Sequence, residues 1–182
     1  FNNIITGCNA DGTFGGLDNL LSKDWKTDEF IKRYSFVDYR KVLKDYHNMD
    51  FVYKKFETNN FFDVEKFIKV IFGYDTYLAF SNGITSNSCN LIAPFAYLKL
   101  KGKLDINRIR NGESKYLLAD VFKKRYQNFN EVPYKIPFAR PMDQWMKDWS
   151  GPKRREFKDD IIMSDYSGNQ KWLIYCLEYF LN

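Results

Sequence analysis

The chain has 182 residues, which is the size of one domain, since a single hydrophobic core is usually filled by roughly 100 to 200 residues. Its composition is 45% hydrophobic and 19% aromatic, which excludes an intrinsically disordered chain. The net charge of +5 is compatible with an anionic ligand such as a nucleotide, but it gives no reason to expect nucleic acid as a partner. No apolar run reaches the roughly 18 to 20 residues of a membrane span, so we expect a globular protein without a membrane partner.

The number and spacing of the cysteine and histidine residues indicate the cellular compartment of the protein. Cys8, Cys89 and Cys176 are widely separated and form no Cys-x-x-Cys pair, and His47 is the only histidine. This spacing argues against a structural zinc site and against a disulfide framework. Because the sequence also shows no secretory leader pattern, we expect a protein of the reducing cytoplasm.

The first predicted element is a strand. Residues 2–6 read N-N-I-I-T, a short β-branched stretch that predicts a buried parallel strand, and they lead into a loop that contains Gly7, Gly12, Gly15 and Gly16. One parallel strand needs a partner. The remainder of the chain is predicted to be mainly helical, so we expect upstream sequence to supply the rest of the sheet.

The clearest helix pattern covers residues 64–71, where apolar side chains recur at helical spacing. Asp63 precedes it as an N-cap, and Gly73 stands where a C-terminal glycine is usual. The pattern therefore predicts a helix that ends near Gly73. Residues 82–88, N-G-I-T-S-N-S, favour a turn after it.

Further amphipathic segments complete a mainly helical chain. Thr27 is a typical N-cap for the first of them, and three prolines predict an extended loop over residues 127–141, with Lys135 inside it. The last helix carries an apolar stripe between Leu173 and Phe180. Helices are predicted over residues 27–47 as one or two elements, 114–126, 142–149, a stretch after Pro152, and 169–180.

The loop at residues 6–16, T-G-C-N-A-D-G-T-F-G-G, has two interpretations from its residues alone. Glycines let a backbone approach phosphate closely, and Asp11, just beyond the end of the strand, is suited to holding a divalent metal. The alternative is a glycine-rich turn that leads into a helix, with Asp11 as its cap. This alternative is the commoner meaning of an isolated glycine-rich loop.

Five segments match, in chain order, the pattern of one enzyme family. Residues 6–16 follow its G-E-G-A/S-D-E-x-F-G-G loop, and residues 88–95, S-C-N-L-I-A-P-F, follow S-x-E-x-R-x-P-F. Residues 112–118, G-E-S-K-Y-L-L, follow G-x-x-K-x-L-L. Residues 135–141, K-I-P-F-A-R-P, follow K-x-G-F-x-x-P, and residues 169–181 are similar to the last helix. The chain thus resembles the asparagine synthetase family of ATP-pyrophosphatase enzymes.

The resemblance implies an α/β fold. The chain would be the C-terminal, mainly helical part of an adenine-nucleotide-hydrolase-like fold of the asparagine-synthetase type, with one core parallel strand near its start. Residues 1–182 would form a single domain or part of one. The family's Ser-Gly-Gly-x-Asp-Ser nucleotide loop would lie upstream in the same protein or come from a separate chain, so we expect this chain alone to bind ATP weakly.

The resemblance also implies an activity. Enzymes of this type are ligases that adenylate a small-molecule carboxylate, release pyrophosphate and form an amide when ammonia or an amine displaces AMP, with ATP and Mg²⁺ as cofactors. Lys135 would be the catalytic residue that stabilises charge developing on phosphate and acyl oxygens. Asp11 would be the metal ligand. The nucleotide-binding positions would be Gly7, Asp11, Gly15 and Gly16.

Two departures from the family pattern open an alternative. Cys8 and Asn90 stand where the family has glutamates, and neither a thiol nor an amide replaces a carboxylate base at neutral pH. The chain could therefore be a catalytically inactive homologue that acts as an interaction or scaffold domain, although Asp11 and Lys135 are retained. A third interpretation, an unrelated helical binding module, would apply if residues 2–6 did not join a parallel sheet.

Overall fold

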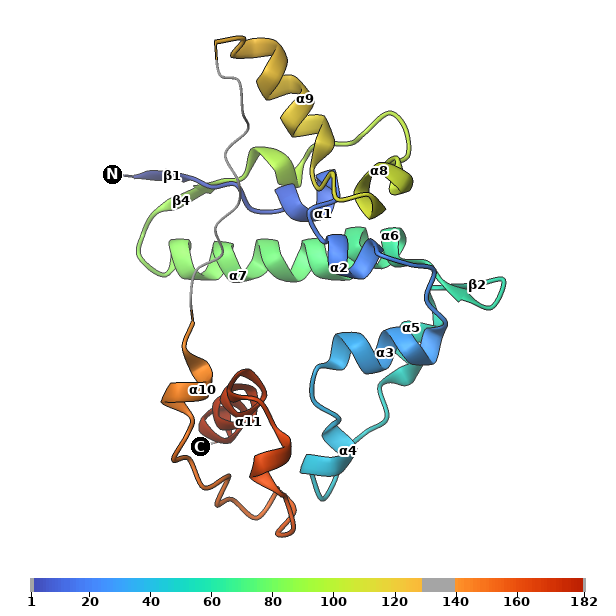
Figure 1. Cartoon of the computed structure of the whole chain (residues 1–182). Helices are drawn as coiled ribbons and strands as arrows, with labels where there is room; N and C mark the ends of the chain where they lie inside the picture. The colour runs from blue at the N-terminus through green and yellow to red at the C-terminus, as the bar shows by residue number, and fades with distance from the viewer. Residues whose placement is uncertain (1, 129–139, 182) are drawn as a thin grey trace. The chain divides into compact units, whose positions relative to one another are not determined.

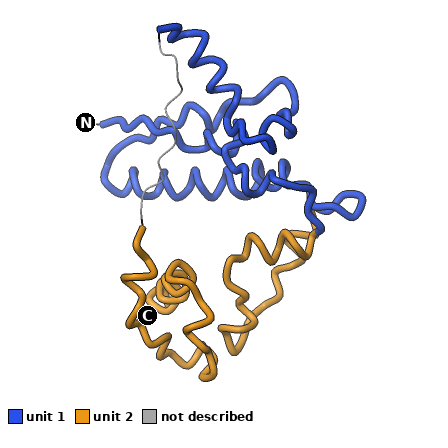
Figure 2. Tube along the Cα trace, viewed as in Figure 1, with its two compact units in different colours: residues 1–26, 56–134 blue, residues 27–55, 135–182 orange. Residues whose placement is uncertain are grey.

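The structure, a computed structural model, describes residues 2–128 and 140–181. The described chain is α/β, with mostly helical elements and two small two-stranded sheets (Figure 1). Within the described residues, no helix combines the length and the apolarity that a membrane crossing requires. The chain divides into two compact units, each formed by two stretches that are far apart in sequence (Figure 2): unit 1 comprises residues 1–26 and 56–134, and unit 2 comprises residues 27–55 and 135–182.

The first sheet of unit 1 is a parallel pair. Strand β1 (Asn3–Ile5) pairs with strand β4 (Asn90–Ile92), and the Thr6 N–H continues the ladder by donating to the Ile92 carbonyl at 3.0 Å. The predicted parallel strand at residues 2–6 is confirmed. The expectation that the chain itself offers no partner strand is wrong. The sequence did not reveal β4, because this strand is too short and too close to Pro94 to show the alternating pattern of a strand.

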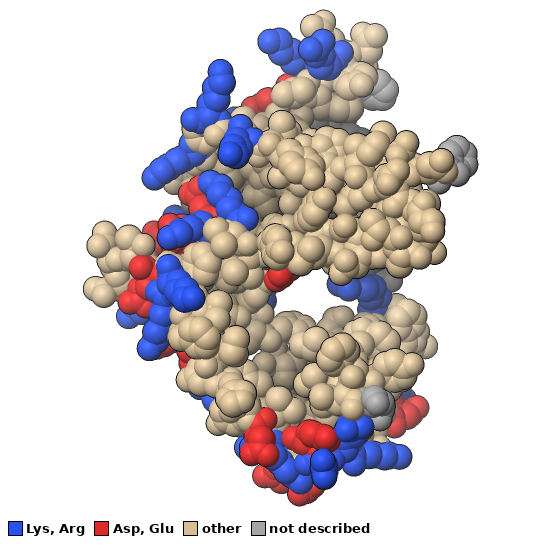
Figure 3. Space-filling view, turned by 180° about the vertical axis from the view of Figure 1, so that it is seen from behind, with Lys and Arg blue, Asp and Glu red and all other residues tan. Residues whose placement is uncertain are grey.

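The prediction that this first strand is buried is also wrong. The Ile5 side chain is 73% exposed and the Ile92 side chain is 41% exposed. Two strands leave much of both sheet faces open, and the described residues add no third strand to this sheet. Seen from behind, the side of unit 1 that carries the chain's start shows a broad area without charged side chains (Figure 3).

A continuous helical run crosses unit 1 after its second sheet. The Asp63 carboxylate caps it by accepting the Lys66 N–H at 2.9 Å, as predicted. Helix α6 (Val64–Phe67) passes through a π-helical turn (Ile68–Phe72) into helix α7 (Gly73–Thr85).

The predicted helix end at Gly73 is wrong. A C-terminal glycine is selected where the backbone is left-handed, but Gly73 has a φ of −63° and lies inside the helix. A side chain there would stand 3.3 Å from the Ile68 carbonyl oxygen of the π-helical turn, which is closer than an ordinary van der Waals contact. The helix reaches Thr85, and only the end of the predicted turn at residues 82–88 lies outside it.

Short helices and an aromatic cluster complete unit 1. Phe56, Phe62 and Phe67 pack with ring centroids 5.3 to 6.0 Å apart. The helix predicted over residues 114–126 is confirmed as α9. The remaining elements are helices α1 (Ala10–Phe14), α2 (Asp18–Leu21), α8 (Ile106–Arg110) and α9 (Tyr116–Arg125), the 3-10 turn Pro94–Ala96, and a hairpin of β2 (Glu57–Thr58) and β3 (Phe61–Phe62).

Unit 2 is built around Val42, Phe157 and Ile174, whose side chains are fully buried. Leu43 and Phe157 form an antiparallel bridge, flanked by hydrogen bonds from the Lys44 N–H to the Glu156 carbonyl and from the Lys158 N–H to the Val42 carbonyl. The helices are α3 (Thr27–Ser35), α4 (Tyr39–Val42), α5 (Asp50–Lys54), α10 (Met142–Trp145) and α11 (Gly168–Phe180), with a 3-10 turn at Met163–Asp165.

Several helix predictions for unit 2 need correction. The one or two helices predicted over residues 27–47 are two helices, α3 and α4, but the second ends at Val42. The helix predicted over residues 142–149 ends at Trp145. No helix follows Pro152 before residue 163, because the strand-like bridge of Phe157 occupies that stretch. Helix α11 is confirmed and starts with a capping box between Ser167 and Gln170. Its predicted stripe is largely exposed, and Ile174 beside it is the buried residue.

Candidate functional site

The first candidate site lies at the carboxyl end of β1. The chain leaves the sheet, passes Asn9 in a left-handed conformation with a φ of 67° and enters α1, so that Asp11 stands in the first turn of that helix. The loop leads into a helix, as the alternative interpretation expected, but Asn9 and not Asp11 is the N-cap residue. The strand, loop and helix thus place the Asp11 carboxylate beyond the sheet edge where ligands of open α/β sheets bind.

Asp11 is paired with a lysine from another motif. Its Oδ1 atom is buried and lies 2.5 Å from the Nζ atom of Lys115. Lys115 precedes α9 and has a φ of 54°, an uncommon conformation for a residue with a side chain. Sequence reasoning treated Lys115 only as part of the G-E-S-K-Y-L-L pattern and missed this ion pair.

Three of the five motif segments contact one another at α1. Residues 6–16 contact residues 88–95 through the Thr13 hydroxyl, which donates to the Phe95 carbonyl at 3.3 Å, and through a T-shaped packing of the Phe14 and Phe95 rings. Residues 112–118 join them through Lys115 and through the Ser114 hydroxyl, which donates to the Gly15 carbonyl at 3.4 Å. Three segments that are far apart in the sequence therefore contact one another in the fold.

The glycines of the loop have different surroundings. Gly15 has a φ of 76°, and a side chain there would collide with Ile109. A side chain at Gly16 would collide with Asp11 and with Lys115. These two glycines are required by close packing, whereas a side chain at Gly7 would have no atom within 4 Å. Of the predicted nucleotide-binding glycines, Gly7 alone faces open space.

The two positions that lack the family's glutamates are not brought together. Cys8 is buried at the carboxyl end of β1. Asn90 pairs in register with Asn3 at the opposite end of the parallel ladder, and its amide donates to the Asn3 side-chain oxygen at 3.1 Å. Lys135, the predicted catalytic residue, lies outside the described residues. Across residues 2–128 and 140–181, no group of three or more His, Cys, Asp or Glu side chains is arranged to hold a metal ion.

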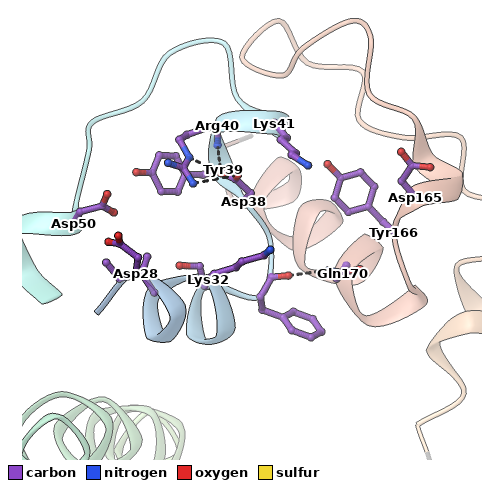
Figure 4. Close-up of a pocket in the computed structure, with 13 residues that line it drawn as sticks. Asp28, Lys32, Asp38, Tyr39, Arg40, Lys41, Asp50, Asp165, Tyr166 and Gln170 are labelled. Carbon is purple, nitrogen blue, oxygen red and sulfur yellow. Dashed lines mark hydrogen bonds and ion pairs between the residues drawn. The ribbon is translucent and has the colours of Figure 1, made fainter. Parts of the chain in front are cut away.

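A second candidate site is a cavity of about 650 Å³ in unit 2 (Figure 4). The Arg40 guanidinium donates to both carboxylate oxygens of Asp38, at 2.8 and 3.3 Å, and this bond lowers the pKa of Asp38 below its ordinary value. Burial raises the pKa of Tyr166, and the carboxylates of Asp165 and Asp38 raise it further. The cavity thus has one internally neutralised pair and a weakly acidic tyrosine.

Five other charged side chains line this cavity. Among the described residues they form no ion pair within 4.0 Å: Asp28, Lys32, Lys41, Asp50 and Asp165. Sequence reasoning missed this cavity, because its residues come from two distant stretches. The signal available in the sequence was the tyrosine-rich stretch from Tyr34 to Tyr53.

Comparisons with known proteins name no relative of this chain. No protein-family model matches it, and no curated protein and no solved structure is significantly similar to it.

Proposed function

We propose that this chain is the C-terminal part of an asparagine-synthetase-like ligase that uses ATP to activate a small-molecule carboxylate and forms an amide with ammonia or an amine. The observation that carries the proposal is that residues 6–16 contact both residues 88–95, through Thr13, and residues 112–118, through Asp11 and Gly15. Short patterns that match a family by chance would not be expected to lie together in the folded chain. Patterns that belong to one site would be.

Asp11 and Lys115 form the centre of the proposed nucleotide site. Both come from motif segments, and Asp11 follows the carboxyl end of a parallel strand, where nucleotides bind in open α/β folds. The Lys115 ammonium is a mobile point charge that suits phosphate oxygens. Gly7, which has open space beside it, would let a ligand approach the backbone closely.

One carboxylate is compatible with Mg²⁺ in a nucleotide site. Magnesium is usually held by one or two carboxylates, with phosphate oxygens and water as its other ligands, so Asp11 would supply the protein ligand. When bound, the metal would neutralise charge on the pyrophosphate. Asp11 would hold the metal, and Lys115 beside it would bind phosphate oxygens.

The exposed sheet supports the idea that further chain completes the site. Parallel sheets are normally covered on both faces, yet Ile5 and Ile92 of the β1–β4 pair are both exposed. We propose that additional strands and the nucleotide loop come from another part of the same protein or from a separate chain. Lys135 would join the completed site as the catalytic lysine.

The test is pyrophosphate release by the complete protein with Mg-ATP and a panel of carboxylates and amines. Asp11→Asn should lower turnover by about 100-fold, as expected for loss of an electrostatic contact made in the transition state. Asp18→Asn, an exposed acid in the same unit, is the matched control and should leave turnover unchanged. Equal turnover of wild type and Asp11→Asn would refute the role of Asp11.

A second candidate function is an interaction domain that has lost catalysis. It is favoured by the separation of Cys8 from Asn90 at opposite ends of the ladder and by the ion pair that already neutralises Asp11. Calorimetry with Mg-ATP and the complete protein distinguishes the two candidates. The ligase should bind Mg-ATP at micromolar concentrations, and an interaction domain should neither bind it nor release pyrophosphate with any substrate pair.

A further inference from the structure

The outer edges of β1 and β4 differ in the backbone groups that they leave unpaired. Between the two strands, Asn90 donates its N–H to the Asn2 carbonyl at 2.8 Å. Thr6 donates its N–H to the Ile92 carbonyl at 3.0 Å. Because the residues of a strand face its two sides alternately, Asn2, Ile4 and Thr6 face β4, and the residues between them face away from it.

The outer edge of β1 is open. Asn3 and Ile5 turn their N–H and C=O groups away from β4. Within residues 2–128 and 140–181, none of these four backbone groups has a hydrogen-bond partner. The Ile5 side chain is also 73% exposed. A row of unpaired backbone groups beside an exposed apolar side chain is a template for pairing with another strand.

The outer edge of β4 is already occupied on both sides of Leu91. The Cys89 N–H donates to the Ile84 carbonyl of α7 at 3.4 Å. The Ala93 carbonyl accepts the Ala96 N–H of the 3-10 turn at 3.1 Å. Helix α7 also packs on β4, which lies between that helix and β1 (Figure 1). A strand that approached β4 would meet groups that are already bonded, so β1 is the edge that can accept a strand.

We propose that β1 is the docking edge for a third strand, which runs parallel to β1 and pairs with Asn3 and Ile5. This inference rests on the proposed function, because the partner is the part of the ligase that completes the Asp11 site. A parallel strand ends at the same edge of the sheet as β1, so the loop after it reaches Asp11. An antiparallel strand would end at the opposite edge. The covering that a parallel sheet receives on both faces accounts for the exposure of Ile5 and Ile92 in this chain.

Amide hydrogen exchange in the complete protein tests the pairing. The Ile4 N–H faces β4 in the ladder, and the Ile5 N–H would face the new strand. The two amides should therefore be protected to within about tenfold of each other. Exchange of the Ile5 amide more than about tenfold faster than that of Ile4 would overturn the proposal. This measurement needs no catalysis, so it decides the inference even if the complete protein releases no pyrophosphate and the proposed function fails.

NMR contacts at Ile4 test the orientation of the new strand. Ile4 faces β4, so an antiparallel partner would place a residue opposite it in a non-hydrogen-bonded pair, with a Cα–Cα distance of about 4.5 Å. A parallel strand should give no contact between the Ile4 Hα and an Hα of the new strand. Such a contact would overturn the parallel orientation. It would also be seen if the partner were a second copy of this chain paired through β1 across a two-fold axis.

Two proline variants compare the two edges of the sheet. Proline lacks the N–H and is tolerated in a strand where that group faces outward. Ile5→Pro should lower pyrophosphate release by the complete protein by at least about tenfold, because it removes a bond to the new strand. Leu91→Pro is the matched control, since it removes an outward N–H at the other edge, and it should leave turnover unchanged. Circular dichroism checks that both variants are folded. Equal turnover of wild type and Ile5→Pro would overturn the assignment of the edge.

Discussion

Lys115 Nζ lies 2.5 Å from Asp11 Oδ1, and this ion pair joins the first turn of α1 to the start of α9. The Asp11 side chain is 45% exposed and the Lys115 side chain is 31% exposed, so water screens much of their attraction. A double-mutant cycle of Asp11→Asn and Lys115→Met, measured by urea unfolding, should give a coupling free energy below about 1 kcal/mol. A coupling near 3 kcal/mol would mean that the pair exists mainly to stabilise the fold.

The neighbouring glycine provides a stability prediction. Gly16→Ala should reduce the free energy of unfolding by about 1–3 kcal/mol, the usual cost of forcing extra volume into a packed site, because the new side chain would collide with Asp11 and Lys115. Gly7→Ala is the matched control. It should change stability by no more than about 0.5 kcal/mol, since it has no neighbour within 4 Å. Equal effects in thermal melts would contradict the packing explanation.

The predicted catalytic lysine is tested in the complete protein. Lys135→Ala should lower pyrophosphate release by about 100-fold or more, corresponding to about 3 kcal/mol of lost transition-state stabilisation. Lys135→Arg should restore little activity, because a planar guanidinium does not replace a compact ammonium. Melting temperatures of both variants should match that of wild type. Full activity of Lys135→Ala would show that the role implied by the resemblance is wrong.

Acid should weaken the ion pair between Arg108 and Asp120, which joins α8 to α9. Arg108 donates to Asp120 at 3.0 Å and lowers the pKa of that carboxyl below its ordinary value of 3.8. A lowered pKa in the folded state stabilises the protein at pH values above the unfolded-state pKa, and this contribution is lost as the pH falls through the folded-state pKa. The melting temperature of wild type should therefore exceed that of Asp120→Asn at pH 7, and the two should converge as the pH falls below the ordinary carboxyl value of 3.8. A constant difference across that range would contradict this explanation.

The helix start at Asp63 could be predicted from the sequence. Its carboxylate accepts the Lys66 N–H three residues further on, so the effect of this cap depends on local sequence. The predicted helix end at Gly73 is wrong because a helix end at glycine depends on tertiary packing as well as on local sequence. Whether a glycine ends a helix depends on the backbone conformation that packing imposes, and the π-helical turn before Gly73 allows the helix to continue.

Short-range patterns were enough to predict the first strand, the glycine-rich loop after it and the position of Asp11 beyond that strand. These patterns could not predict which residues Asp11 contacts. Its pairing with Lys115 and the gathering of three motif segments depend on contacts between residues far apart in the chain. The cavity beside Tyr39 was decided in the same way, since its walls form only when residues 165–170 pack against α3 and α4. No local pattern encodes such contacts, which arise from the packing of complementary surfaces.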